Sequence, residues 1–383
     1  RAGLMTGRYP MRFGMARAVI PPWRHFGLDP AELTLPEALG KLGYTQRGIF
    51  GKWHLGHNDT KWHPNNQGFT HFHGHFNGAI DYFDLTREGE RDWHLNGKTN
   101  PETGYATDLI ADAASQFISR HAKGEAPYFC YVPFNAPHSP FQAPDKYLKK
   151  FAHLASPDAK GKNKTLRQTV AAMVACMDDG IGRILKSIDA SGEAANTIVL
   201  FFSDNGGLST LGRIGPGCNL PLRAGKGWLY EGGLREPTLI RAPGITRPGS
   251  VSHKPMISMD FFPTMLELAG LPAQPKLHAD GQSLVSQLKG NDTGSRTLYW
   301  HYPHYHGSSW KPGAAIRDGD WKLIEFYHYD KFELYNLAED TAESKDVTQK
   351  NEKTLLKLQA EYIDWFRNVK STRNFAPGDI HIG

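Results

Sequence analysis

Four short polar segments of this chain carry the side chains best suited to chemistry. Lys52 and His54 share the segment 51–56, and Asn135-Ala136-Pro137-His138 ends in a second histidine. Asp204-Asn205 precedes two glycines, and Lys226 stands between two more. Lysines suit a tetrahedral oxyanion such as sulfate or phosphate, and histidines can transfer protons near neutral pH. Adjacent carboxylate and amide oxygens, without sulfur or imidazole, suit a hard cation such as Ca²⁺ or Mg²⁺.

Each of these residues also has an ordinary explanation. An Asp-Asn-Gly sequence commonly closes a strand as a turn, Lys52 is compatible with a solvated loop, and His138 with a hydrogen-bonded turn. Their placement favours function, because the segments 51–56 and 135–138 each follow directly after a predicted strand and the segment 203–207 closes a third one. Ligands of open α/β sheets lie beyond the carboxyl ends of the strands. The sequence therefore predicts that separate strands deliver these groups to one shared site.

Alternation of short β-rich runs with longer helical runs sets the predicted fold. The expected strands are Thr45–Phe50, Tyr128–Phe134, Thr197–Ser203 and Glu236–Arg241. The second and third are almost wholly apolar, as is typical of strands covered on both faces. The expected helices are Leu35–Leu42, capped by Thr34 and Glu37, Thr107–Arg120, Leu166–Ile188, and Met259–Leu268 stopped by Gly270. This pattern predicts an α/β fold with a large, mostly parallel sheet sandwiched by helices.

The pattern changes after about Gly290. Four short strands are expected, followed by one amphipathic helix over 351–367: Thr297–Tyr302, Ala314–Arg317, Trp321–Phe326 and Phe332–Tyr335. Asp318-Gly319 between the second and third strands is a strong hairpin signal. We therefore predict a catalytic domain over residues 1–290 and a smaller C-terminal subdomain over 291–383, built from an antiparallel sheet and a helix.

Bulk composition narrows the function classes. The formal net charge is +5 in 383 residues, without a block of like charges or a recognised nucleic-acid-binding motif. No run approaches the ~18 apolar residues of a membrane span. Two segments rich in histidine and aromatic residues, 71–77 and 300–306, are candidates for contacts with a sugar or equally for ordinary packing between domains.

The first ten residues, Arg1-Ala2-Gly3-Leu4-Met5-Thr6-Gly7-Arg8-Tyr9-Pro10, resemble the rear half of the sulfatase signature. The four polar segments also resemble that family in order and approximate spacing, as do residues 317–323 and 333–337. The resemblance covers essentially the whole chain. It identifies the chain as a member of the formylglycine-dependent, arylsulfatase-like sulfatases of the alkaline phosphatase superfamily.

That resemblance implies the cofactors. Asp204 and Asn205 would be two ligands of one Ca²⁺ ion, and an Asp pair on an upstream strand would supply others. The nucleophile would be a formylglycine four positions before Arg1, installed by a formylglycine-generating maturation enzyme. We therefore expect the chain as written to be an N-terminally truncated fragment that does not hydrolyse 4-nitrophenyl sulfate.

The resemblance also implies residue roles. Arg1 would orient the formylglycine hydroxyl, and His54 would hydrogen-bond its hydrate and assist turnover. The sulfate oxygens would be bound by Lys52, His138 and Lys226, and His138 is the candidate to protonate the leaving alcohol. The implied substrate is a sulfated carbohydrate, as in polysaccharide degradation, or an aryl sulfate.

Two alternatives stay open. One is a phosphate or phosphonate ester hydrolase of the same superfamily, which would hold two transition metals rather than one Ca²⁺. The other is an inactive sulfate-binding fragment. The family resemblance implies a periplasmic or secreted location, or a lysosomal one in a eukaryote.

Overall fold

The computed structural model describes residues 1–16, 19–155, 166–210, 215–370 and 380–381. The chain divides into two compact units. Unit 1 comprises residues 1–6, 19–198 and 270–272, and unit 2 comprises residues 7–18, 199–269 and 273–383. The domain boundary expected after residue 290 stays a prediction.

Unit 1 is built on a five-stranded sheet of order β6-β5-β2-β1-β7. Its strands are β1 (Gln46–Lys52), β2 (His71–His75), β5 (His94–Leu95), β6 (Lys98–Thr99) and β7 (Tyr128–Tyr131). The three longest strands are parallel, since β1 pairs in parallel with both β2 and β7. The short strands β5 and β6 extend one edge in antiparallel pairing. The expected α/β class with a mostly parallel sheet is confirmed.

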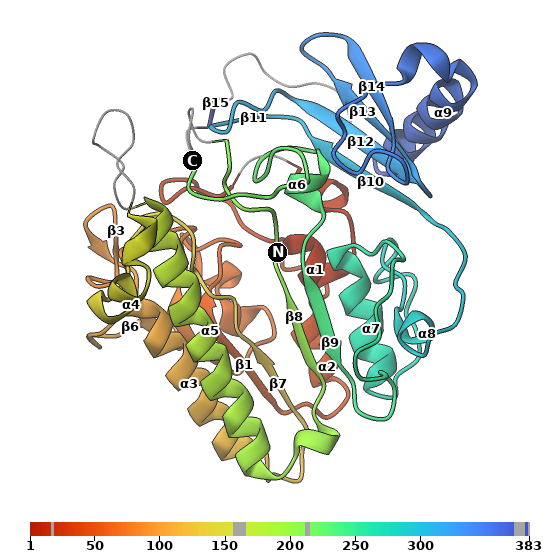
Figure 1. Cartoon of the computed structure of the whole chain (residues 1–383). Helices are drawn as coiled ribbons and strands as arrows, with labels where there is room; N and C mark the ends of the chain where they lie inside the picture. Colours follow the sequence, from red (N-terminus) through yellow and green to blue (C-terminus); the bar gives the residue numbers. More distant parts are fainter. Residues whose placement is uncertain (17–18, 156–165, 211–214, 371–379, 382–383) are drawn as a thin grey trace. The chain divides into compact units, whose positions relative to one another are not determined.

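Helices α3 (Ala106–His121) and α5 (Leu166–Ser191) form the helical layers of unit 1. Helix α3 contacts β1 and β7, and α5 packs along α3 (Figure 1). The buried face of α3 presents Ala106, Ile110, Ala114 and Phe117, three or four residues apart, as helical periodicity requires. Tyr128 and Cys130 of β7 pack into the same cluster. Successive strand residues point to opposite faces, so Phe129 and Tyr131 instead stack near Phe69.

Helix α2 (Leu35–Gly40) begins as the sequence predicts. The backbone N–H of Glu37 donates to the Thr34 hydroxyl, and the Glu37 carboxylate accepts from the backbone N–H of Thr34. This reciprocal capping box satisfies two amides that the first turn leaves unpaired. The remaining short elements of unit 1 are α1 (Ala2–Thr6), β3 (Thr86–Arg87), β4 (Glu90–Arg91) and α4 (Asp145–Lys150).

Unit 2 contains a two-stranded sheet where the sequence predicts two strands. Strands β8 (Val199–Phe202) and β9 (Thr238–Arg241) pair antiparallel with each other. The residues of β8 and β7 are half-buried. An apolar run indicates that a strand exists, but it carries no information about the partner of that strand.

The C-terminal part of unit 2 matches the prediction closely. An antiparallel sheet of order β10-β12-β13-β14 consists of β10 (Thr297–Tyr302), β12 (Gly313–Asp318), β13 (Trp321–Phe326) and β14 (Lys331–Asn336). Asp318 pairs with Trp321, so the two-residue hairpin loop is Gly319-Asp320, one position later than expected. Gly319 adopts φ 57°, a conformation that favours glycine at the first loop position.

Helix α9 (Glu352–Asn368) covers one face of this sheet, as predicted. Its residues Leu358, Tyr362 and Phe366 pack with Ile316 and Leu323 of the strands. The opposite face carries Ile324 and Tyr335, which pack with the segment that precedes α6. The other elements of unit 2 are α6 (Glu231–Leu234), α7 (Phe261–Leu268), α8 (Val285–Leu288), β11 (Tyr305–His306) and β15 (Ile380–His381).

Candidate active site

One group of the predicted site residues lies where β1 ends, in unit 1. Lys52 is the last residue of β1 and is buried, and its backbone N–H donates to the carbonyl of Pro133 at 2.9 Å. The Arg1 guanidinium donates to the carbonyl oxygen of Lys52 at 2.8 Å and to the Tyr131 hydroxyl at 3.2 Å. The structure therefore brings Arg1 and Lys52 together, although they are 51 residues apart in sequence.

His54 is held in an unusual backbone conformation beside them. Its φ is 59°, in the left-handed region that non-glycine residues rarely adopt. Its N–H donates to the carbonyl of Phe76 at 2.9 Å. The imidazole lies directly over Gly78, where a Cβ would come within 2.4 Å of the His54 Cε1 atom. Such strain persists only where the surroundings fix it, and it is frequent at functional sites.

The protonation state of His54 follows from these surroundings. Burial lowers the pKa of His54 well below its ordinary value, and the positive charges of Lys52 and Arg1 lower it further, with a smaller contribution from His138. A hydrogen bond to the carbonyl of Ile20 only partly opposes this. His54 is therefore neutral at pH 7 and sits in a positive field, which is the electrostatic environment an anion requires.

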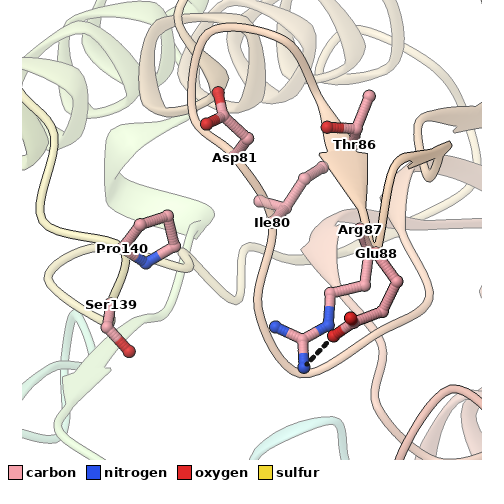
Figure 2. Close-up of a pocket in the computed structure, with 7 residues that line it drawn as sticks. All are labelled: Ile80, Asp81, Thr86, Arg87, Glu88, Ser139 and Pro140. Carbon is pink, nitrogen blue, oxygen red and sulfur yellow. Dashed lines mark ion pairs between the residues drawn. The ribbon is translucent and has the colours of Figure 1, made fainter.

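His138 lies in the loop after β7. Its N–H closes a turn to the carbonyl of Asn135 at 2.9 Å, and the Tyr82 hydroxyl donates to its carbonyl at 2.9 Å. Its ring Nδ1 lies 2.7 Å from the carbonyl oxygen of Ser139. This contact assigns the proton to Nδ1, because a carbonyl can only accept. Nε2 is then the ring nitrogen that does not face Ser139, and a cavity of about 440 Å³ opens next to this loop (Figure 2).

A second group of the predicted site residues lies in unit 2, after β8. Asp204 is exposed and Asn205 is half-buried. Lys226 lies on a neighbouring loop, and its backbone N–H donates to the carbonyl of Gly207 at 3.1 Å. Burial lowers the pKa of Lys226, while the negative charge of Asp204 raises it. Asp204 and Lys226 are therefore close enough to interact electrostatically.

Glycine makes this loop pairing possible. A Cβ on Gly206 would lie 1.8 Å from the carbonyl oxygen of Gly232, and one on Gly225 would lie 2.1 Å from that of Gly207. Real Cβ atoms do not approach backbone atoms so closely, so no other residue fits without moving the loops. The predicted glycine-rich segments thus act by letting two stretches of backbone touch.

Two further residues near this second group were not assigned a catalytic or metal role from the sequence. Burial raises the pKa of Glu236 to about 7, and the nearby charge of Asp204 raises it too. Its Oε1 atom is buried and, within the described residues, has no hydrogen-bond partner. His306, part of the segment 300–306, lies against Gly227, and burial and then the charge of Lys226 lower its pKa. Glu236 gave no signal because a glutamate at the start of an expected strand is unremarkable in sequence.

The donor set in unit 2 fits part of the shell of a hard cation. Asn205 uses its amide nitrogen to donate to the carbonyl of Gly206 at 3.1 Å, which leaves its amide oxygen for a ligand. Carboxylate oxygens of Asp204 and Glu236 lie nearby, and oxygen donors are what Ca²⁺ prefers. Across the described ranges, no group of three or more His, Cys, Asp or Glu side chains is arranged to hold a metal ion. Asp204 and Asn205 would therefore supply only part of a Ca²⁺ shell.

The predicted site residues thus fall into two groups. Unit 1 brings together Arg1, Lys52, His54 and His138. Unit 2 brings together the Asp204-Asn205 turn and Lys226. The convergence of both groups on one site stays a prediction.

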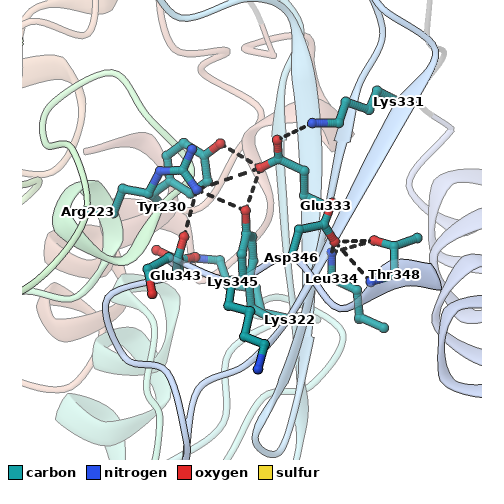
Figure 3. Close-up of polar contacts among 12 residues, drawn as sticks. Arg223, Tyr230, Lys322, Lys331, Glu333, Leu334, Glu343, Lys345, Asp346 and Thr348 are labelled. Atoms are coloured by element: carbon teal, nitrogen blue, oxygen red, sulfur yellow. Dashed lines mark hydrogen bonds and ion pairs between the residues drawn. The ribbon is translucent and has the colours of Figure 1, made fainter. Parts of the chain in front are cut away.

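A buried network of charges and hydroxyls anchors the segment that carries Lys226 (Figure 3). The Arg223 guanidinium donates to the Tyr335 hydroxyl at 2.9 Å and to the carbonyl of Glu343 at 2.7 Å. The hydroxyls of Tyr230 and Tyr335 both donate to one oxygen of Glu333, at 2.6 and 2.7 Å. Both ends of the loop 223–230 are therefore fixed to the C-terminal strands.

Lys322 forms the centre of a second part of this network. Its side chain is fully buried, and its Nζ lies 2.9 Å from Glu231 Oε1 and 2.8 Å from Glu343 Oε1. Arg317 approaches the other oxygen of Glu231 at 3.4 Å. Burial acts to raise the pKa of Glu231, but Lys322 and Arg317 hold it below its ordinary value. The pKa of Glu343 is raised by burial, although Lys322 opposes this.

Comparison with known proteins identifies the family. Residues 1–271 match the family model described as Sulfatase, and residues 224–367 match the one described as N-sulphoglucosamine sulphohydrolase, C-terminal. The chain therefore belongs to the sulfatase family, which confirms the resemblance seen in the sequence.

Individual relatives agree. The N-acetylgalactosamine-6-sulfatase of Mus musculus is 33% identical over 367 residues, covering 91% of this chain and 66% of that protein. A sulfatase of Formosa agariphila is 33% identical over 284 residues, covering 69% of this chain and 49% of that protein. The chain thus spans about half to two thirds of the length of these curated relatives.

Solved structures share the fold. The crystal structure of Ps i-CgsB in complex with k-i-k-neocarrahexaose superposes with a TM-score of 0.84 at 28% identity, covering 99% of this chain and 83% of that one. The structure of BT4656 with D-glucosamine-2-N,6-O-disulfate superposes with a TM-score of 0.77 at 22% identity, covering 96% and 88%. Among the helices that the structure describes, none has both the length and the apolar composition needed to cross a membrane.

Proposed function

We propose that this protein is a sulfuric ester hydrolase that removes sulfate from a sulfated carbohydrate. The observation that carries the proposal is the positive field around the neutral His54 in unit 1, to which Lys52, Arg1 and His138 contribute. A buried lysine and an arginine that face a neutral imidazole suit a tetrahedral oxyanion. Family membership and the sulfated sugars named for the relatives point to sulfate as that anion and to a glycan as its carrier.

The proposed mechanism gives each residue of this chain a task. Lys52 and Lys226 bind sulfate oxygens and neutralise the charge that builds on them in the transition state. Arg1 and His54 orient the nucleophile by hydrogen bonds. In its doubly protonated form His138 binds the sulfate through Nε2–H and passes that proton to the departing sugar oxygen, while its Nδ1–H stays hydrogen-bonded to the carbonyl of Ser139.

Two groups that are not side chains of the described residues would complete the active site: a modified residue and a metal ion. A formylglycine hydrate upstream of Arg1 would supply the attacking hydroxyl. Asp204 and Asn205 would hold one Ca²⁺ ion in part, and this ion would supply positive charge for the sulfate. The protein would depend on a formylglycine-generating maturation enzyme. We further propose a periplasmic or secreted location, or a lysosomal one in a eukaryote.

The test uses the full-length protein with Lys226→Ala. Loss of one aligned charge partner should lower turnover roughly 10²- to 10³-fold. Sulfate release from 4-nitrophenyl sulfate and from a sulfated galactose disaccharide measures it, and circular dichroism checks the fold. Lys289→Ala, an exposed lysine of the same unit, is the matched control and should retain full turnover. Near-normal turnover in Lys226→Ala would refute the role of this lysine.

A further inference from the structure

A polar cavity adjoins the His138 loop in unit 1 and has no role in the mechanism above. Its volume is about 440 Å³, within the range that small-molecule sites occupy. One wall is the stretch 80–88, which includes strand β3, and the other is Ser139-Pro140, directly after His138 (Figure 2). A ligand in this cavity would therefore lie beside the residue proposed to protonate the leaving hydroxyl.

The two walls are tied together by hydrogen bonds. The Tyr82 backbone N–H donates to Gln142 Oε1 at 2.8 Å, and Gln142 Nε2 donates to Asp81 Oδ2 at 2.6 Å. The Tyr82 hydroxyl reaches the carbonyl of His138, and the Tyr105 hydroxyl donates to the carbonyl of Gln142 at 2.8 Å. Because both walls share these bonds, the cavity is pre-formed, and a ligand that enters it does not have to order the loops.

The lining indicates which ligand fits. Only Ile80 and Pro140 among the seven lining residues are apolar. The other five are polar: Asp81, Thr86, Arg87, Glu88 and Ser139. The hydroxyl groups of a ligand would therefore find both hydrogen-bond donors and acceptors in the cavity. None of these seven residues is aromatic. A polyhydroxylated ring therefore suits this cavity better than an aryl ring does.

The charges of the lining residues indicate which sugar rings fit the cavity. Arg87 Nη2 pairs with Glu88 Oε1 at 3.0 Å, as Figure 2 shows. Asp81 adds a second carboxylate, whose Oδ1 accepts the backbone N–H groups of Phe83 and Asp84. The lining therefore carries no surplus positive charge, and a sugar with an additional sulfate on the same ring would meet carboxylates without a compensating cation.

We propose that this cavity binds the uncharged sugar ring whose hydroxyl leaves from the sulfate, and that Arg87 is its main specificity-determining residue. The inference rests on the proposed function, since that function places the leaving hydroxyl at His138. Arg87 is half-buried, so its guanidinium can hydrogen-bond ring hydroxyls while it remains paired with Glu88.

The experiment compares two substrates in the full-length protein. One is 4-nitrophenyl sulfate, which has no sugar, and the other is a galactose disaccharide with a single sulfate. Arg87→Ala should lower kcat/KM for the disaccharide roughly 10- to 100-fold, mostly through KM, because one charge-assisted hydrogen bond is lost. It should leave 4-nitrophenyl sulfate within about twofold. The double variant Arg87→Ala/Glu88→Ala should show the same loss, which excludes an effect of an unpaired Glu88. Lys98→Ala, an exposed cation of the same unit, is the control.

The outcomes separate this inference from the proposed function. An equal loss on both substrates, or no loss on the disaccharide, would overturn the assignment of the cavity. A disaccharide with a second sulfate on the same ring provides a further check. If the wild-type protein prefers this substrate and Arg87→Ala abolishes the preference, the choice of an uncharged ligand is overturned. If the wild-type protein releases no sulfate, the cavity is tested separately by measuring the binding of the desulfated disaccharide by calorimetry. Binding that Arg87→Ala weakens would support the cavity while the proposed function fails, and absence of binding would overturn the cavity as well.

Discussion

Replacing Lys322 by methionine tests whether the buried charge network holds unit 2 together. Methionine keeps the length of the aliphatic stem and removes the ammonium group, so packing changes little. The two carboxylates of Glu231 and Glu343, which lie 2.9 and 2.8 Å from Nζ, would lose their shared cation. Arg317 can compensate only one of them, and only from 3.4 Å.

The expected cost follows from burial. The side chains of Lys322 and Glu343 are fully buried, and that of Glu231 nearly so. Breaking a buried ion pair by removing one partner costs about 3–5 kcal/mol, since a charge is left without compensation. For a unit of this size that should lower the Tm by roughly 6–20 °C. The loss should be smaller at pH 5 than at pH 8, because Glu343, whose pKa burial already raises, can then take up a proton.

Urea unfolding at both pH values and calorimetry measure these quantities. The double variant Lys322→Met/Glu343→Gln should recover part of the stability, because the amide replaces a carboxylate that has lost its cation. Lys331→Met, on the neighbouring strand, removes a lysine whose side chain is 54% exposed and pairs with Glu333 at 2.7 Å. Because Lys331 is exposed and Glu333 keeps its hydrogen bonds from Tyr230 and Tyr335, this loss should cost less than about 1 kcal/mol. The reasoning is refuted if Lys322→Met costs no more than this control, or if the double variant is as unstable as the single one.

Three further predictions use other parts of the molecule. His138→Ala should slow hydrolysis of a sugar sulfate at least tenfold more than that of 4-nitrophenyl sulfate, whose good leaving group needs little proton donation; parallel kinetics on the two substrates would contradict the role of His138. Burial lowers the pKa of His75 to about 3 from an ordinary 6.5, so the free energy of unfolding should fall as the pH drops below 6.5, by about 2 kcal/mol at pH 5. Urea titrations should show that His75→Gln removes most of this acid-dependent loss. An unchanged pH profile in His75→Gln would count against the role of His75. Gly206→Ala should destabilise unit 2 by roughly 1–3 kcal/mol or more, whereas Gly307→Ala, where a Cβ meets no atom within 4 Å, should be nearly neutral; equal melting temperatures of the two variants would disprove the contact argument.

Local signals in the sequence sufficed for much of the fold. The capping residues Thr34 and Glu37 are three positions apart, so their hydrogen bonds are encoded locally and the start of α2 was predicted correctly. The C-terminal strands alternate short runs with a glycine turn, so both their bounds and their antiparallel order followed. The partner of β8 was not predictable in this way, because it depends on β9, more than thirty residues later.

The site shows the same division. Lys52, His54 and His138 could be proposed because polar residues directly after strands mark the ligand-binding edge of such a sheet, and the structure places them together with Arg1. Arg87 could not, because it lies in the two-residue strand β3, which has no periodic pattern to mark it. Side chains whose importance comes from burial or from a cavity carry no such local signature in the sequence.

The glycine contacts between the loops of unit 2 also bear on how this protein can diversify. Around Gly206 and Gly225 backbone touches backbone, so a substitution there moves the residues that would handle sulfate. The β3–β4 hairpin in unit 1 has the opposite character, because Glu88 and Glu90 at its tip are exposed. Substitutions are therefore tolerated at the hairpin, where the sugar would bind, and are disfavoured at the glycine loops, where the sulfate would bind. New glycan preferences can evolve at the hairpin without a redesign of the chemical machinery.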